Sequence, residues 1–464
     1  MNSTGRSNAV VLGGSMAGLL AARVLADHYD RVIVVDRDPL PGTSRPRPGV
    51  PHGRHVHGLH PRGLQVLEEL FDGLTDKLVA DGAVSTDVLE ESRFLLSGHR
   101  FRQAPSGLRG VLCSRPFLEG HLRARVRALP QVLFLNAAIT GLTSSDDRER
   151  ITGVRIAPSR CAERAIEADL VVDATGRGSR SPLWLAELGY QRPVEDRVEI
   201  GIGYATRTFR LRPGALGRDV LVVNGGTPDQ PRSGVLAAQE GGRHIVTLSG
   251  ILGDHPPTDR NGFAAFARSL AFPDIADALA GAETLDEGLA FRFPASVRRR
   301  YEGLAEHPTR LLVTGDAVCS FNPVYGQGMT VAALEAALLR DQLRAGRTPD
   351  PRRWYRAVGR VVDAPWQVAV GADLAYPEVA GRRTAQIRMV NSYLPRLHAA
   401  ATTDAALALA FVRVLGLLDR PESLLRPDRL LRVAVARPQK ASPPQVPTRP
   451  ARHPVPSAAE RAAS

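Results

Sequence analysis

The sequence is poor in cysteine and in long apolar runs, and each shortage excludes a class of protein. Cys113, Cys161 and Cys319 stand far apart in 464 residues, too scattered for a disulfide framework or a cysteine-based zinc site. This usage is typical of a reducing compartment, so we expect a cytoplasmic protein. The N-terminus enters an apolar segment with no basic region before it, which predicts no signal peptide. The longest apolar run, 405–418, is too short to cross a bilayer.

Lysine is almost absent, and this changes the meaning of the net charge of +12. Only Lys77 and Lys440 are lysines, and acidic residues are interleaved with the arginines along most of the chain. The use of arginine in place of lysine is better explained by codon bias than by a basic surface that binds a polyanion. We therefore expect no nucleic-acid partner.

What the chain does have is alternating strand and helix patterns. Residues 8–36 predict a β-α-β unit, and 198–250 predict a series of antiparallel strands without helices. Residues 132–142 and 151–156 are expected to form a hairpin. A mostly helical region follows at 352–418. The sequence thus indicates an α/β protein with an inserted β-sheet.

A glycine turn connects the first strand to the first helix. Gly13, Gly14, Ala17 and Gly18 lie in GGSMAG, and Asp36 ends the next strand. This context is that of a dinucleotide fingerprint, in which the turn holds a pyrophosphate and the acid binds the ribose. The middle glycine of the fingerprint is replaced by Ser15, which removes some room but adds a hydroxyl donor.

Ser15 allows a competing interpretation, because Gly13 to Ala17 approximates the G-x-S-x-G elbow of serine hydrolases. We reject it, since that elbow normally lies well inside a sheet and not on the first strand. Asp36 also does not fit the acid of a catalytic triad.

Two further segments have the layout of a strand followed by a ligand-facing turn. In 311–339, an apolar strand ends at Gly315 and Asp316, and a loop with Pro323 leads into an alanine-rich helix. The helix start offers backbone N–H groups and a positive dipole end to an electron-rich group. In 169–180, a buried strand delivers Thr175-Gly176 to a turn, which alone is a weak signal.

Four histidines, His52, His55, His57 and His60, crowd into one loop and raise the question of a metal site. No carboxylate or cysteine lies among them, and neighbouring arginines would repel a cation. We expect no metal here. The loop is instead predicted to line a ligand, with Arg54 or His55 in contact.

Taken in order, GGSMAG with Asp36, DATGRGS and GDAVCSFNPVYGQG resemble the FAD-dependent monooxygenases of the aromatic hydroxylase type. The resemblance covers most of 8–345 and implies a Rossmann-like FAD domain of the glutathione reductase type. Within this group, four segments most resemble bacterial flavin epoxidases that act on polyether polyketide or terpenoid precursors. These segments are GVPHGRHVHGL, VVDATGRGS, FPASVRRRYEGL and FNPVYGQGM.

The resemblance implies a division of the chain into interleaved parts. The FAD-binding domain is expected at 1–89, 111–190 and 291–345, and a mostly antiparallel β-sheet substrate domain at 90–110 and 191–290. A C-terminal helical region at 346–436 and a disordered tail at 437–464 complete the expected organisation.

The same resemblance assigns the cofactor-binding residues. The glycine turn would hold the pyrophosphate, Asp36 the ribose and Asp316 the ribityl or phosphate edge. Backbone N–H groups at Gly328 and Met329 would face the N1-C2=O2 edge of the flavin, and no side chain is expected to be catalytic. The full predicted set is Gly13, Gly14, Ser15, Ala17, Gly18, Asp36, Arg37, Arg54, Arg115, Ile139, Gly315, Asp316, Pro323, Gly326, Gly328 and Met329.

The family usually has Asp-Gly where this chain has Thr175-Gly176, which weakens the case for a flavin contact at that turn. The implied chemistry is attack by a flavin C4a-hydroperoxide, formed from reduced FAD and O2, on an alkene of a large apolar polyketide or terpenoid intermediate of bacterial secondary metabolism. Hydroxylation of an aromatic or indole ring is the alternative, and it would benefit from a base such as Tyr204, Arg207 or His244.

No second glycine fingerprint is present, so electrons are expected from NAD(P)H bound transiently or from reduced flavin supplied by a separate reductase. The sequence has no W-x-W-x-I-P pattern, which argues against a flavin halogenase. Residues 291–294, FRFP, weakly suggest an isoprenoid reductase, a non-oxygenating alternative. The expected partner is an apolar small molecule.

Overall fold

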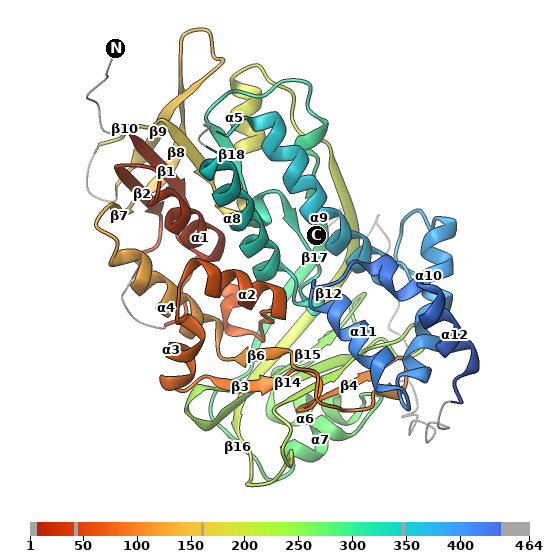
Figure 1. Cartoon of the computed structure of the whole chain (residues 1–464). Coiled ribbons are helices and arrows are strands. Elements are labelled where there is room, and N and C mark those ends of the chain that lie inside the picture. The colour runs from red at the N-terminus through yellow and green to blue at the C-terminus, as the bar shows by residue number, and fades with distance from the viewer. Residues whose placement is uncertain (1–6, 41–44, 159–161, 346–348, 438–464) are drawn as a thin grey trace, which may run out of the picture.

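The computed structural model describes residues 7–40, 45–158, 162–345 and 349–437. Two large sheets lie end to end, with helices packed against both (Figure 1). Apart from Arg437, the tail predicted at 437–464 lies outside the described residues. Within the described ranges, no helix combines the length and hydrophobicity needed to cross a membrane.

A parallel sheet of five strands contains the predicted β-α-β unit. Four of its strands are mainly buried apolar runs, as expected for strands covered on both faces, whereas the edge strand at 132–136 is only partly buried. In spatial order they are β18 (Leu311–Val313), β11 (Leu170–Asp173), β1 (Asn8–Leu12), β2 (Arg31–Asp36) and β7 (Val132–Asn136). Helices α1 (Met16–Leu25), α4 (Arg115–Arg127) and α8 (Gly328–Arg344) pack with it, α1 lying between α4 and α8. The α/β class predicted from the sequence is confirmed.

The second large sheet is mostly antiparallel and has nine strands. Its two longest strands, β12 (Glu195–Arg210) and β17 (Leu289–Arg299), pair along most of their lengths. β17 runs across residue 291, where the expected boundary between two parts of the chain lies. The other members are β4 (Ser92–Leu96), β5 (His99–Arg100), β13 (Leu221–Asn224), β14 (Ser233–Gln239), β15 (Arg243–Gly250), β16 (Glu283–Thr284) and β19 (Cys319–Ser320).

The hairpin predicted from 132–142 and 151–156 is only half correct. β7 pairs in parallel with β2, and only the following strand, β8 (Ala138–Ser144), forms a hairpin with β9 (Ile151–Ala157). The side-chain amide of Asn136 donates to the carbonyls of Asp36 and Arg37, which fixes the end of β7 beside β2. Periodicity alone could not reveal this change of sheet within one apolar segment.

Smaller elements complete the fold. β10 (Arg164–Glu167) joins the β8-β9 hairpin, and β3 (Val84–Asp87) pairs with β6 (Arg109–Leu112). The shorter helices are α2 (Pro61–Leu70), α3 (Leu74–Ala80), α5 (Ser181–Glu187), α6 (Arg260–Arg268) and α7 (Asp274–Leu279). The C-terminal helices are α9 (Pro351–Asp373), α10 (Ala385–Ala400), α11 (Ala405–Leu415) and α12 (Pro427–Val435).

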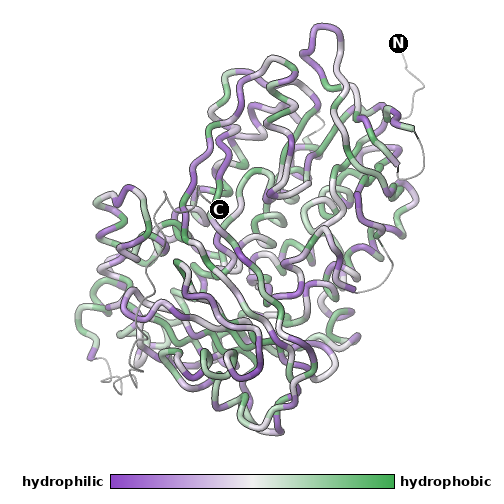
Figure 2. Tube along the Cα trace, turned by 180° about the vertical axis from the view of Figure 1, so that it is seen from behind, coloured by the Kyte–Doolittle hydropathy of each residue, from purple (hydrophilic) through white to green (hydrophobic). Residues whose placement is uncertain are grey.

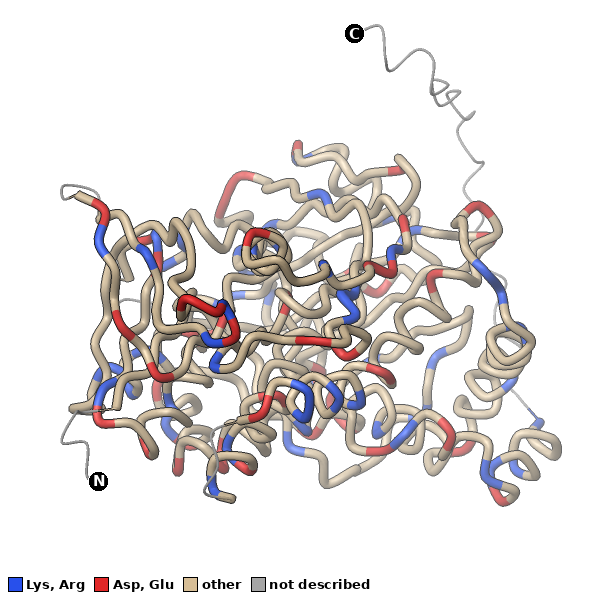
Figure 3. The backbone as a smooth tube through the Cα atoms, turned by 90° about the horizontal axis from the view of Figure 1, so that it is seen from above, with Lys and Arg blue, Asp and Glu red and all other residues tan. Residues whose placement is uncertain are grey.

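The surface pattern follows the fold. The tip of the β8-β9 hairpin projects from the molecule and is hydrophilic, whereas hydrophobic residues concentrate along the packed strands and helices (Figure 2). Basic and acidic residues are interleaved over the whole described backbone (Figure 3). The largest apolar core lies around the parallel sheet, and a separate one joins the second sheet to α6 and α7.

Candidate functional site

The carboxyl ends of four parallel strands meet at one edge of the first sheet. Leu12 of β1 is in register with Val35 of β2 and with Asp173 of β11, which in turn pairs with Val313 of β18. The glycine turn follows β1, Asp36 ends β2, and Thr175 and Asp316 lie in the turns after β11 and β18. In open α/β sheets, ligands bind at this edge.

The turn after β1 accepts only glycine at two positions. Gly13 has φ +96°, and a Cβ on it would lie 2.6 Å from the carbonyl oxygen of Ala174. A Cβ on Gly18 would lie 1.8 Å from the carbonyl oxygen of Gly13. The turn and α1 are therefore packed too closely for side chains, which leaves the start of α1 open toward the cavity beside it.

Asp36 holds this turn as well as lining the cavity. Its Oδ2 accepts a hydrogen bond of 2.7 Å from the N–H of Gly14, and Oδ1 accepts one of 2.8 Å from the N–H of Asp38. Arg37 and Ile139 lie in the cavity wall near it. The acid at the end of β2 thus fixes the shape of the groove that it faces.

A cluster of charges surrounds the start of α1 that sequence reasoning missed. Glu119 is 3% exposed and accepts hydrogen bonds from the hydroxyl of Ser15 and the N–H of Met16. Although burial acts in the opposite direction, Arg115 above all lowers the pKa of Glu119 to about 2, with help from Arg47. A buried carboxylate here is therefore ionised and has arginines on several sides.

Of the loop arginines, Arg47 reaches the groove and Arg54 does not. Arg47 is 5% exposed, and its Nη1 lies 3.4 Å from Asp36 Oδ2 and 3.8 Å from Asp38 Oδ2. Its Nε is buried without a hydrogen-bond partner in the described structure. Arg54 is exposed and lies outside the cavity wall. Arg115, which the resemblance assigned to the cofactor, lines the cavity at the start of α4.

On the other side of the groove, a buried glutamate supports the turn after β18. Glu335 of α8 is fully buried, and its Oε2 accepts from the hydroxyl of Thr314 and, at 2.6 Å, from the N–H of Gly315. Gly315 has φ +65°, and a Cβ on it would lie 2.9 Å from Ala17 Cβ. These contacts place Asp316 at the cavity wall, where burial raises the pKa of its carboxyl.

The loop between β19 and α8 carries the remaining predicted residues. Pro323–Tyr325 forms a 3-10 turn, Gly326 follows with φ +65°, and α8 begins at Gly328. Tyr325 is held at both ends, since its carbonyl contacts His60 Nε2 at 2.9 Å and its hydroxyl donates to Asp373 Oδ1 at 2.9 Å. The predicted cavity-lining residues here are Pro323, Gly326, Gly328 and Met329.

The four histidines of the loop at 51–60 pack between the β19-α8 loop and the second sheet. His60 contacts that loop, His55 contacts the sheet, and His57 contacts His55. His55 Nδ1 lies 2.7 Å from Thr206 Oγ1, and His57 Nδ1 lies 3.0 Å from the carbonyl of His55. Burial lowers the pKa of His52 and of His55 to about 4 in each case. No group of three or more potential metal ligands occurs in the described ranges. These histidines are neutral parts of the cavity wall.

A single continuous cavity of about 2070 Å³ joins all of these features. It runs from the glycine turn, past the loop at 319–328, to the face of the second sheet and to α10 and α11. Gly14 and Gly18 lie behind the wall and not in it. Of the three candidate bases, Tyr204 lines the cavity, whereas Arg207 and His244 lie outside its wall. The volume exceeds that of an ordinary small-molecule pocket and accommodates two ligands.

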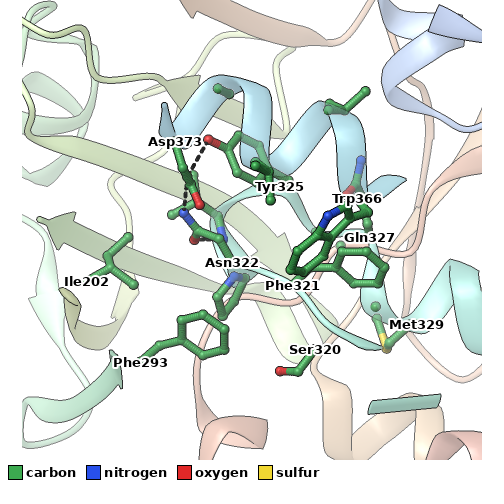
Figure 4. A pocket seen from close by; sticks show the side chains of 18 of the residues that line it. Ile202, Phe293, Ser320, Phe321, Asn322, Tyr325, Gln327, Met329, Trp366 and Asp373 are labelled. Atoms are coloured by element: carbon green, nitrogen blue, oxygen red, sulfur yellow. Dashed lines mark hydrogen bonds between the residues drawn. The ribbon is translucent and has the colours of Figure 1, made fainter. Parts of the chain in front are cut away.

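One carboxylate in this wall was not found by sequence reasoning. Asp373 ends α9, is 1% exposed, and accepts hydrogen bonds from Asn322 Nδ2 at 2.8 Å and from Tyr325 (Figure 4). Burial raises its pKa to about 6, even though these two hydrogen bonds act in the opposite direction. No motif marks it, because only the packing of α9 brings it to the loop.

Known proteins with similar sequences or structures include several flavoproteins. A family described as "FAD dependent oxidoreductase" matches residues 8–244. The chain is 36% identical over 431 residues to Protein Rv3254 of Mycobacterium tuberculosis, covering 89% of this chain and 90% of that protein. It is 27% identical over 366 residues to a kynurenine 3-monooxygenase of Salinispora arenicola, covering 73% of each. The flavin-dependent brominase Bmp2 has a similar structure, with a TM-score of 0.65 at 14% identity, covering 92% of this chain and 98% of that one.

Proposed function

The chain belongs to the FAD-dependent oxidoreductase family, and from this premise we propose that it is a monooxygenase that epoxidises an alkene of a large apolar polyketide or terpenoid molecule. The observation that carries the proposal is the continuity of the cavity. One space of about 2070 Å³ connects the dinucleotide groove with the face of the second sheet, so a cofactor and a large substrate can meet in it.

The groove fits FAD. The glycine cradle has no room for a Cβ at Gly13 or Gly18, and Arg47 Nε is a buried donor without a partner, suited to an anion. On this proposal the start of α1, with Arg47 and Arg115, binds the pyrophosphate, and Asp36 binds the adenosine ribose. Ile139 packs near the adenine.

FAD in this position would supply the activation of O2, and the chain supplies placement and shielding. Asp316 holds the ribityl side, and the backbone N–H groups at the start of α8 stabilise negative charge on the flavin. Phe321 and Trp366, both buried in the cavity wall, exclude water from the reacting centre. Reducing equivalents come from NADH, NADPH or a separate flavin reductase in the cytoplasm.

Hydroxylation of an aromatic ring is a second candidate, and one observation favours it. Asp373 is a buried carboxylate with a pKa raised to about 6, and it lines the same cavity. A group of this kind can accept a proton from a phenol that is being oxygenated. The name of the Salinispora relative points in the same direction.

The test is oxygen incorporation by the FAD-loaded protein. Farnesol and 2-naphthol serve as alkene and aromatic probes under 18-O2 with NADH or NADPH and a flavin reductase. One labelled atom as an epoxide supports the first candidate, and a labelled dihydroxynaphthalene supports the second. A yellow protein that labels neither probe contradicts the monooxygenase proposal, and if it oxidises NAD(P)H without the added flavin reductase the result supports a reductase. A colourless protein that FAD cannot reconstitute contradicts all of these functions.

A further inference from the structure

Seven side chains in the cavity wall have buried polar atoms without a partner in the described structure, and two of them lie in or against the loop before α8. These two are Gln327, whose amide nitrogen and oxygen are both unpaired, and Asp373, whose Oδ2 is unpaired. Both residues are 1% exposed, and both line the cavity. Native proteins rarely leave buried polar atoms unsatisfied unless a ligand or water completes them. The pair therefore indicates where the polar part of a ligand lies.

The carboxyl group of Asp373 is held in one orientation. Its Oδ1 accepts from Asn322 Nδ2 at 2.8 Å and from the Tyr325 hydroxyl at 2.9 Å, and both donors belong to the loop before α8 (Figure 4). These two bonds clamp one oxygen against the loop. The other oxygen, Oδ2, has no hydrogen-bond partner in the described structure.

The surroundings of this oxygen indicate which donor it accepts. The neighbouring wall contains the buried apolar side chains of Ile202, Phe293 and Trp366 (Figure 4). The hydroxyls of Tyr204 and Tyr376 also lie near Asp373, but neither forms a hydrogen bond to it in the described ranges. No basic residue there forms an ion pair with it. An acceptor left unpaired in such a place is destabilising. A ligand that brings a donor removes this destabilisation.

A cationic donor is disfavoured because the cavity already carries an excess of positive charge. Arginines in its wall outnumber carboxylates, and those without an ion pair in the described ranges include Arg177 and Arg383. A neutral hydroxyl group brings a donor without adding to that excess.

We infer that Asp373 Oδ2 binds a hydroxyl group of the substrate and thereby fixes the direction in which an otherwise apolar molecule enters the cavity. The inference rests on the proposed function, which makes this cavity the substrate site. It narrows the substrate class to apolar molecules that carry a hydroxyl group. Asp373 is the specificity-determining residue, and Asn322 and Tyr325 are positioning residues.

The substitution Asp373→Asn tests this with little change of shape. The amide oxygen of asparagine can still accept from Asn322 and Tyr325, which turns the NH2 group toward the cavity. An acceptor is thereby replaced by a donor while the loop stays clamped. Dissociation constants are measured on the FAD-loaded protein with 2-naphthol and with 2-methoxynaphthalene, by naphthalene fluorescence and flavin absorbance. The exposed Asp76→Asn on α3 is the matched control.

Wild type and Asp76→Asn are expected to bind 2-naphthol about tenfold more tightly than 2-methoxynaphthalene. In Asp373→Asn this preference is expected to disappear or to reverse, with FAD content unchanged. If Asp373 has a purely structural role, Asp373→Asn will weaken the binding of both ligands by the same factor, and this result would overturn the inference. Wild type without a preference for the hydroxyl also overturns it, even if the variant does not fold. Loss of FAD from wild type contradicts the proposed function instead, so the two failures are distinguishable.

Discussion

The buried carboxyl group of Glu335 is expected to make the folded protein less stable as the pH rises from 4.5 to about 7. Burial raises the pKa of its carboxyl from 4.5 to about 7, against the opposing effect of hydrogen bonds from Thr314 and Gly315. Between these two pH values the folded protein keeps a proton that the unfolded chain has lost. The free energy of unfolding contributed by Glu335 is therefore highest below pH 4.5 and falls as the pH rises to about 7.

The size of the effect follows from the shift. One pKa unit corresponds to about 1.4 kcal/mol, so the full change amounts to about 3 kcal/mol. In Glu335→Gln the group is neutral at every pH, and this component vanishes. The buried NH2 group lacks a partner, as Glu335 Oε1 does now, and this lowers stability by about 1 to 3 kcal/mol at all pH values.

The assay is urea unfolding of the FAD-loaded protein at several pH values from 4.5 to 8, in wild type, in Glu335→Gln and in the control Glu306→Gln, whose side chain is exposed. The free energy of unfolding of wild type minus that of Glu335→Gln should fall by about 3 kcal/mol across this range, from a positive value to zero or below, while wild type and Glu306→Gln run in parallel. Parallel curves for all three proteins would refute the reasoning, because Glu335 would then be ionised in the folded state throughout.

Other substitutions test the cofactor groove. Gly18→Ala should give protein without bound FAD, seen as the loss of flavin absorbance, because its Cβ would lie 1.8 Å from the carbonyl oxygen of Gly13. Asp36→Ala should weaken FAD binding by about 1 to 3 kcal/mol in calorimetry, and unchanged affinity would contradict its role at the ribose. Arg47→Ala should weaken FAD binding more than Arg54→Ala in the same experiment, since Arg47 alone of the two lines the cavity. Equal effects would show that the loop arginines act only through net charge.

The parts of the site that the sequence predicted are arranged by residues close to them in the chain. The turn from Gly13 to Gly18 and the acid at Asp36 are fixed by neighbouring strands and one helix, so their spacing reveals their arrangement. The same holds for Asp316 and the start of α8 at Gly328, which follow one strand within a short stretch. In each case the backbone conformation that places the residue is set within a few turns of chain.

The parts that the sequence did not reveal depend on distant contacts. Glu119 reaches Ser15 across 104 residues, and Asp373 reaches Asn322 across 51. The choice between Arg47 and Arg54 depends on how a proline-rich loop folds, and both arginines look alike in the sequence. Buried carboxylates carry no pattern of their own, because what makes them functional is the set of groups that packing brings to them.

The long pairing of β12 with β17 has a consequence for protein engineering. β12 begins and β17 ends beside the groove, where β17 also pairs with β19. From there the two strands run side by side through the second sheet, with one register shift between Glu199 and Ile202. On the proposed function, the region that receives the substrate and the region that holds the cofactor are thus made in part from the same two strands. They are not separable cassettes, and a chimaera with a relative would have to exchange both strands in full, together with the loop that follows β19.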